Sequence, residues 1–240
     1  MITICRRELA AAYHSFTGWL IALTVLILGG IFTWAYCCLQ KSTQFEYVIA
    51  SMEIVLILVV PVLSMRSLAE ERKQRTDQLL YSLPVRMSGV VLGKFLAMAF
   101  VMALPLTVMG LYPLALRAFG GVNLSAAYGN LFAFFLLACA LTALGEFISA
   151  CSDNPTVALI LTLLAMLLCY FLSPLTALIG DGNVFTSFFS GIMNALSLFE
   201  RQISFRAGLF DLGAVTYYAG VTAIFLALTV LIMERRRWHG

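Results

Sequence analysis

The sequence has few charged residues, and this scarcity excludes a water-soluble globular protein. Its 240 residues contain 15 Lys and Arg and 12 Asp and Glu, so that 11% are charged while 62% are hydrophobic. A soluble domain carries about 25% charged residues, which cover its surface. We therefore predict an integral membrane protein.

Residues that carry enzymatic chemistry are also scarce. The only histidines, His14 and His239, lie near the two ends, and no Ser-His-Asp, H-E-x-x-H or carboxylate cluster is present. The six cysteines form no C-x-x-C pair and are interpreted as small hydrophobic residues. "GVVLGKF" (residues 89–95) has one residue too few between its glycines for a P-loop and Phe in place of Ser or Thr. We expect no catalytic residue, metal or cofactor in this chain, and no nucleic-acid partner because no basic stripe is interleaved with aromatics.

Long apolar runs predict an all-α integral membrane protein with six transmembrane helices in one domain spanning residues 1–240. A spanning helix needs about 20 mostly apolar residues. The six runs cover approximately residues 17–39, 45–66, 91–117, 126–150, 155–179 and 209–233. Because backbone groups in lipid must be paired internally, each run is predicted to be helical. The first run is too long for a signal peptide and has no cleavage site, so we predict a retained span.

The basic residues predict the orientation of these spans. With both termini in the cytoplasm, 11 of the 15 Lys and Arg lie in cytoplasmic segments, and only Lys41, Arg117, Arg201 and Arg206 lie outside. Cytoplasmic segments of membrane proteins are enriched in basic residues. We therefore predict a multi-pass protein of the cell membrane, expected to be a bacterial plasma membrane, with both termini cytoplasmic.

The cytoplasmic segment 67–90, between the second and third predicted spans, holds a concentration of charge and an apolar stripe. Thr76, Leu79, Leu80 and Leu83 recur at helical spacing among charged residues, and Pro84 then interrupts the helix. A solvated loop that only satisfies the orientation rule needs neither the stripe nor the break. The residues alone leave two interpretations open: a solvated loop, or an amphipathic helix with a role beyond orientation.

Two further segments flank the spans. Residues 2–16 place apolar side chains on one helical face, which predicts an N-terminal helix in the inner interface. Residues 181–208 are apolar but rich in Asn, Ser and Gly, which predicts an outer re-entrant or interfacial helix before the sixth span. That helix either packs as an ordinary element or forms the lip of an exit.

Two carboxylates fall inside predicted spans: Glu53 in the second and Glu146 near the inner end of the fourth. Charge in hydrocarbon is costly and is usually functional. Both are candidates for a translocation path. Glu53 is either a proton relay or a residue that lines a water-filled cleft or pairs across a helix interface.

The segment "PVLSMRSLAEERKQRTDQLLYSLPVRMSGVVLGKF" resembles the signature of ABC type-2 permeases, and more narrowly of the branch that contains gliding-motility and copper-processing permeases. The matching residues are Pro61, Met65, Arg66, Glu70, Glu71, Arg72, Thr76, Leu79, Leu80, Pro84, Val85, Gly93, Lys94 and Phe95. Arg75 and Gln78 depart from the usual Gly and Glu. "RRELAAAYHSFTGWL" and the block from residue 197 to 237 are also similar to the family, so the resemblance covers nearly the whole chain.

The resemblance implies that segment 67–90 contains a coupling helix that docks on a separate ABC ATPase subunit, which binds ATP and Mg. The implied docking residues are Glu70, Glu71, Arg72, Arg75, Thr76, Leu79, Leu80, Leu83 and Pro84. It also implies two ATPase copies, a second permease copy or homologous permease, and surrounding membrane lipid. The expected function is the permease subunit of an ATP-driven exporter. The alternatives are a non-transporting membrane anchor or mechanical component, and a proton-coupled secondary transporter that uses Glu53.

Overall fold

The computed structural model describes residues 2–39, 44–74, 86–118, 123–178, 197–206, 208 and 210–239. The side chains of Ile2, Cys38, residues 172–178, Trp238 and His239 are outside this description. The described part of the chain contains helices and no strands. This result confirms the predicted all-α class of the fold.

The long helices agree in place with most of the predicted spans. Their bounds are α2 Phe16–Thr33, which continues as a π-helix over Trp34–Leu39, α3 Glu46–Ser64, α6 Met87–Met109, α8 Leu124–Cys151, α9 Pro155–Leu178 and α12 Leu212–His239. The shorter helices are α1 Ile2–His14, α4 Ala69–Lys73, α7 Leu111–Arg117 and α11 Gln202–Arg206. Five helical stretches are long and apolar enough to cross a membrane, and the described apolar part of α9 is shorter, Pro155–Phe171.

The third predicted span, residues 91–117, is not one continuous helix. It begins earlier, at Met87, and is divided at Gly110 into α6 and α7. Pro113 has no N–H to donate to the carbonyl of Met109 four residues earlier, so the regular helix cannot continue unchanged. The hydroxyl of Tyr128 on α8 donates a hydrogen bond of 3.1 Å to the next carbonyl, that of Gly110. Residues 87–90, predicted as part of the cytoplasmic loop, belong to α6.

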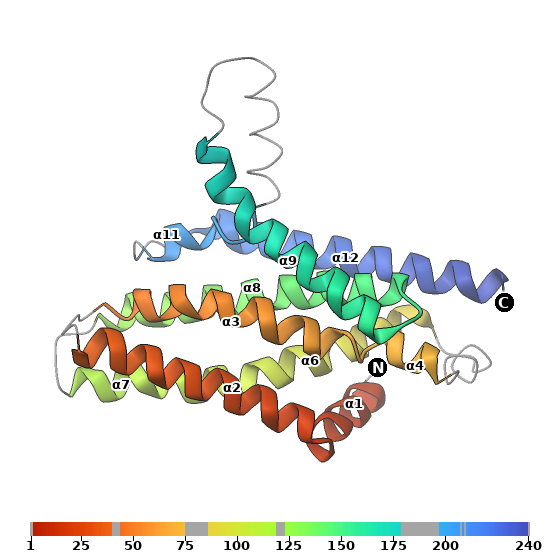
Figure 1. Cartoon of the computed structure of the whole chain (residues 1–240), viewed down its shortest axis with the longest axis horizontal. Helices are drawn as coiled ribbons and strands as arrows, with labels where there is room; N and C mark the ends of the chain where they lie inside the picture. The colour runs from red at the N-terminus through yellow and green to blue at the C-terminus, as the bar shows by residue number, and fades with distance from the viewer. Residues whose placement is uncertain are drawn as a thin grey trace.

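Helix α8 lies at the centre of the bundle, with α3, α6, α9, α11 and α12 all in contact with it (Figure 1). Its buried face is composed largely of Ala, Gly and Ser, which allow neighbouring backbones to approach closely. At 1.5 Å of rise per residue, its 28 residues are about 42 Å long, enough to cross a hydrocarbon core of about 30 Å.

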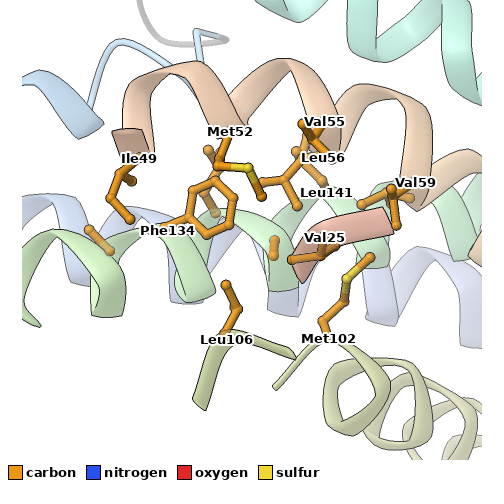
Figure 2. Close-up of a cluster of buried hydrophobic side chains, with 14 of the residues drawn as sticks. Val25, Ile49, Met52, Val55, Leu56, Val59, Met102, Leu106, Phe134 and Leu141 are labelled. Atoms are coloured by element: carbon orange, nitrogen blue, oxygen red, sulfur yellow. The ribbon is translucent and has the colours of Figure 1, made fainter. Parts of the chain in front are cut away.

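The main core lies between α2, α3, α6 and α8, where Met52 and Phe134 meet at its centre (Figure 2). The residues around them are Val25, Ile49, Val55, Leu56, Val59, Met102, Leu106 and Leu141. A second, smaller cluster joins α4, α6, α8 and α12 through Leu68, Met87, Val91, Phe95 and Met233. The two clusters hold the spans together along most of their length.

The bundle has two ends that differ in their polar residues. We call the one that contains α1, α4, the start of α6 and the end of α12 the α4 end, and the one that contains α11 and the start of α3 the α11 end. Both chain termini lie at the α4 end (Figure 1).

Candidate functional site: the two polar ends of the bundle

Helix α4 carries the three described residues of the predicted docking surface, Glu70, Glu71 and Arg72. Its start is fixed by α8, because the hydroxyl oxygen of Ser149 accepts hydrogen bonds from the backbone N–H groups of Leu68, at 3.2 Å, and Ala69, at 3.0 Å. The first N–H groups of a helix have no partner within it and need such a cap. Helix α4 is therefore attached to the central helix of the bundle.

Lys94, on α6, connects α4 with α1. Its ammonium group lies 2.7 Å from Glu71 and 3.5 Å from Glu8, and it donates a hydrogen bond of 2.8 Å to the carbonyl of Ser67. Only 2% of the Lys94 side chain is exposed. Since a buried ammonium group is costly without partners, these contacts hold the three elements in one arrangement. Arg7 adds a pair with Glu8 at 2.8 Å.

Arg72 connects α4 with the opposite side of the same end. It donates hydrogen bonds to the carbonyl of Ser152 at 3.0 Å and to the carboxylate of Asp153 at 3.3 Å. Arg236 near the end of α12 pairs with the same carboxylate at 2.9 Å. The hydrogen bond from Arg236, together with the charges of both guanidinium groups, holds the pKa of Asp153 below its usual value. Helix α4 is thus linked to the turn between α8 and α9 and to α12.

Gly145 on α8 allows the close approach of α3 and α9 near this end. A Cβ atom at this position would lie 2.6 Å from the Ser64 hydroxyl oxygen, 2.7 Å from its Cβ, and 3.3 Å from a Thr162 methyl carbon. No ordinary side-chain contact is as short as the first two distances. Only glycine therefore permits this spacing of the three helices.

Glu146, the second predicted path residue, lies at the α4 end and is fully buried. Neither carboxylate oxygen has a hydrogen-bond partner among the described residues. Glu146 lies three residues before Ser149, the residue of α8 that caps α4. The structure therefore places Glu146 beside the network of α4 and not in a cavity with Glu53.

A cavity of about 260 Å³ lies at the α4 end between α1, α2 and α6. Its charged lining residues are Glu8, Arg66, Glu70 and Lys94, and they pair among themselves: Arg66 lies 3.9 Å from Glu70, and Lys94 lies 3.5 Å from Glu8. Arg66 also bonds the Thr17 hydroxyl. The formal charges of these four residues cancel.

At the α11 end, Glu53 pairs with Arg206 of α11. The Glu53 side chain is only 4% exposed, whereas that of Arg206 is 31% exposed. Both residues line a cavity of about 390 Å³, which we call the α11-end cavity. This geometry corresponds to the predicted alternative in which Glu53 lines a cleft and pairs across helices.

Aromatic side chains form two pairs in the α11-end cavity. Tyr36 and Tyr47 are stacked with ring centroids 6.2 Å apart, and Tyr170 meets Phe199 edge to face at 5.2 Å. The first pair comes from the π-helix and α3, and the second from α9 and the turn before α11. The cavity is therefore built from four separate segments of the chain, which converge only in the folded protein.

Six of the predicted docking residues lie outside the described residues: Arg75, Thr76, Leu79, Leu80, Leu83 and Pro84. Of the predicted outer helical segment 181–208, the described part contains the five-residue helix α11. The described residues thus include only the borders of the predicted docking segment and of the predicted outer segment.

The sequence did not predict the partners of Glu53 and of the backbone at the start of α4. Arg206 is 153 residues from Glu53, and Ser149 is 80 residues from the backbone of Ala69 that it caps. One signal was present for the first pair: a carboxylate within an apolar span requires a cation, and few basic residues are predicted on the outer side. For Ser149, a hydroxyl among many small residues of α8, the sequence offers no such signal.

The bundle has apolar helices of spanning length, a charged helix linked to it at one end and a polar cavity at the other. These features define a multi-pass membrane protein of the transporter type. The family model described as ABC-2 family transporter protein matches residues 30–234, and the chain belongs to this family. The match supports a membrane transport component and, in general, a partner ATPase subunit. A search of the curated proteins finds no match.

Proposed function

We propose that the chain is the permease subunit of an ATP-driven exporter and that its α4 end is cytoplasmic and docks an ABC ATPase. The docking segment is 67–90, with the apolar stripe Leu79, Leu80 and Leu83 as the contact and the charges of α4 as its rim. An amphipathic helix that places its apolar face in a groove is a common mode of recognition between proteins. ATP and Mg would bind the ATPase.

The observation that carries this proposal is the set of connections around α4. Glu71 contacts Lys94 of α6, Arg72 contacts Asp153 next to α9 and, through it, Arg236 of α12, and Ser149 of α8 caps the helix. A displacement of α4 would consequently act on four long helices at once. A loop that serves only to orient the spans has no need of such connections.

In the proposed complex, two permease chains, identical or homologous, form the path, and two ATPase subunits lie below them. Closure of the ATPase pair on ATP would shift α4 of each chain and tilt the spans that it contacts. The path would then alternate between an inward and an outward opening. The concentration of basic residues at the α4 end and in segment 67–90 supports a cytoplasmic location of this end.

Two other functions are also compatible with these residues: a membrane anchor or mechanical component, and a secondary transporter. A membrane anchor or mechanical component would use the same ATPase docking without carrying a substrate, and ATP turnover would then be insensitive to any cargo. A secondary transporter would use Glu53 as a proton relay and would work without an ATPase. The ion pair between Glu53 and Arg206 supports a structural or cavity-lining role for this carboxylate, because it joins α3 to α11 beside the cavity that both residues line.

The proposal is tested by purifying the chain together with its ABC ATPase. Leu80→Asp places a charge on the predicted apolar stripe and should release the ATPase or uncouple its turnover from transport. Loss of a buried interface anchor commonly costs more than about 1 kcal/mol. Gln78→Asp is the matched control, since helical spacing would place residue 78 on the side of the predicted helix opposite to residues 79, 80 and 83. If both variants retain a fully coupled ATPase, the docking proposal is wrong.

A further inference from the structure

The α11-end cavity contains more polar groups than a lipid-facing surface tolerates. Glu53, Glu200 and Arg206 are charged, and Ser51 and three tyrosine hydroxyls add further polar atoms. Charged side chains within membrane spans face water-filled cavities or protein partners and mark paths for substrates and ions. The cavity is therefore suited to a ligand and not to lipid tails.

The charges that line the cavity favour a cation. Glu53 and Glu200 are two carboxylates and Arg206 is a single guanidinium group, which leaves a formal excess of one negative charge. Arg206 is engaged with Glu53. Glu200 accepts a hydrogen bond from the Ser197 hydroxyl at 2.7 Å, and within the described part of the chain it has no ion pair. One carboxylate at this cavity is thus available to a positively charged ligand.

The aromatic lining favours the same kind of ligand. Tyr36, Tyr47, Tyr170 and Phe199 present two ring pairs, and the Ser51 hydroxyl orients Tyr36 through a hydrogen bond of 3.1 Å. The faces of aromatic rings attract cations, and aromatic cages are the usual recognition elements for quaternary ammonium groups. The ring edges and the neighbouring Ile54 and Ile203 provide an apolar surface for the remainder of the molecule.

We propose that the α11-end cavity binds an organic cation with an apolar body, such as a quaternary ammonium or phosphonium compound. Glu200 supplies the opposite charge, and the Tyr170–Phe199 pair supplies the aromatic contact. The volume of about 390 Å³ is within the range of about 300–1,000 Å³ typical of sites for small molecules. The identification of this ligand as the transported substrate rests on the proposed function, whereas its binding does not.

The test measures binding of tetraphenylphosphonium to the purified full-length chain in nanodiscs, with empty nanodiscs subtracted and no ATPase or nucleotide present. Tetraphenylborate, with the same four phenyl groups and the opposite charge, controls for general hydrophobic binding. We expect saturable binding of the phosphonium ion and none of the borate. Glu200→Gln should weaken phosphonium binding about tenfold, and Tyr170→Leu about fivefold.

The matched control is Glu46→Gln. Glu46 is the first residue of α3, at the same end of the bundle as the cavity, and it does not line the cavity. This variant should change phosphonium binding by less than about twofold, as expected for a screened, more distant charge. Equal affinity for the two ions, or equal losses in Glu46→Gln and Glu200→Gln, would overturn the proposal. Because the assay contains no ATPase, this failure would leave ATPase docking untouched, and release of the ATPase by Leu80→Asp would leave the binding result untouched.

Discussion

The two ends of the bundle use their charged residues in different ways. At the α4 end, Glu71, Lys94, Arg72, Asp153 and Arg236 connect α4 to α6, to the turn before α9 and to α12. At the α11 end, one ion pair joins Glu53 to Arg206, and Glu200 remains without a basic partner within the described part of the chain. Ion pairs and hydrogen bonds join several helices at the α4 end, whereas the cavity at the α11 end is lined by a carboxylate that has no ion pair within the described part of the chain.

Both ends contain buried polar side chains that lack a hydrogen-bond partner among the described residues: Glu146 at the α4 end and two amides at the α11 end. Asn130 and Gln202 are fully buried, and their side-chain amides have no hydrogen-bond partner among the described residues. Such groups cost free energy when they are buried, so they weaken the packing around them. The comparison supports two proposals: that the α4 end transmits a displacement, and that the α11-end cavity accommodates a ligand.

The largest expected effect concerns Lys94. Lys94→Met removes the cation 2.7 Å from Glu71, which keeps its longer pair of 3.8 Å with Arg7, and also removes the hydrogen bond to the Ser67 carbonyl. The free energy of unfolding should fall by about 3 kcal/mol, as for other buried pairs that lose one partner. Lys73→Met is the control, since Lys73 on the same short helix is exposed. Equilibrium unfolding in mixed micelles measures both variants, and equal values would show that the network does not stabilise the α4 end.

The ion pair at the α11 end should contribute less, because Arg206 is partly exposed. Arg206→Met leaves Glu53 buried and unpaired, and we expect a loss of about 2 kcal/mol in the free energy of unfolding. Adding Glu53→Gln should recover part of that loss, because the uncompensated charge disappears. Arg201→Met is the control and removes only a cation–π contact of 5.1 Å with Tyr217, worth about 0.5 kcal/mol. A double variant less stable than Arg206→Met would contradict this account.

Gly145 tests the packing that supports the α4 end. Gly145→Ala brings a Cβ to within 2.7 Å of Ser64 and should reduce the free energy of unfolding by about 1–3 kcal/mol through overpacking. Gly129→Ala, on the same helix, meets no atom within 4 Å and should be neutral or stabilising by up to about 1 kcal/mol. The difference between the two variants in one unfolding assay is the informative quantity. Its absence would show that α3 and α9 are not held at this spacing.

The smallest effect is expected at Asp153, whose side chain is 81% exposed. Exposed pairs contribute about 0–1 kcal/mol, so Asp153→Asn should be slightly less stable than the wild type at neutral pH. Because the folded-state pKa of Asp153 is lowered, its contribution is present above the unfolded value of about 3.9 and disappears as the pH falls through the folded value. Unfolding curves of both proteins between pH 7 and pH 3 should therefore converge. A difference that grows toward acid would contradict the pairing.

Most of the helical architecture follows from the sequence, because hydropathy reports directly on burial in lipid. The predicted span 126–150 is observed as Leu124–Cys151, and 209–233 as Leu212–His239. The division at Gly110 was not predicted, since a window of apolar residues does not register where Pro113 removes a backbone donor. The π-helix over Trp34–Leu39 was also not predicted.

The candidate sites follow from the sequence only in part. Glu53 and the charges of α4 are conspicuous because they interrupt apolar surroundings. Their partners Arg206, Ser149 and Asp153 are ordinary in sequence, and only the tertiary fold brings them near. The excess of one negative charge in the α11-end cavity depends on Glu200, which precedes α11 and belongs to no predicted span.

The most direct test of the contrast between the ends is photo-crosslinking in cell membranes that contain the ABC ATPase. Benzoylphenylalanine replaces Gln74, the exposed residue that follows α4, or Ile203, an exposed residue of α11. We predict an adduct of the chain with the ATPase from position 74 and none from position 203. An adduct from position 203 alone would place the ATPase at the wrong end and would contradict the account.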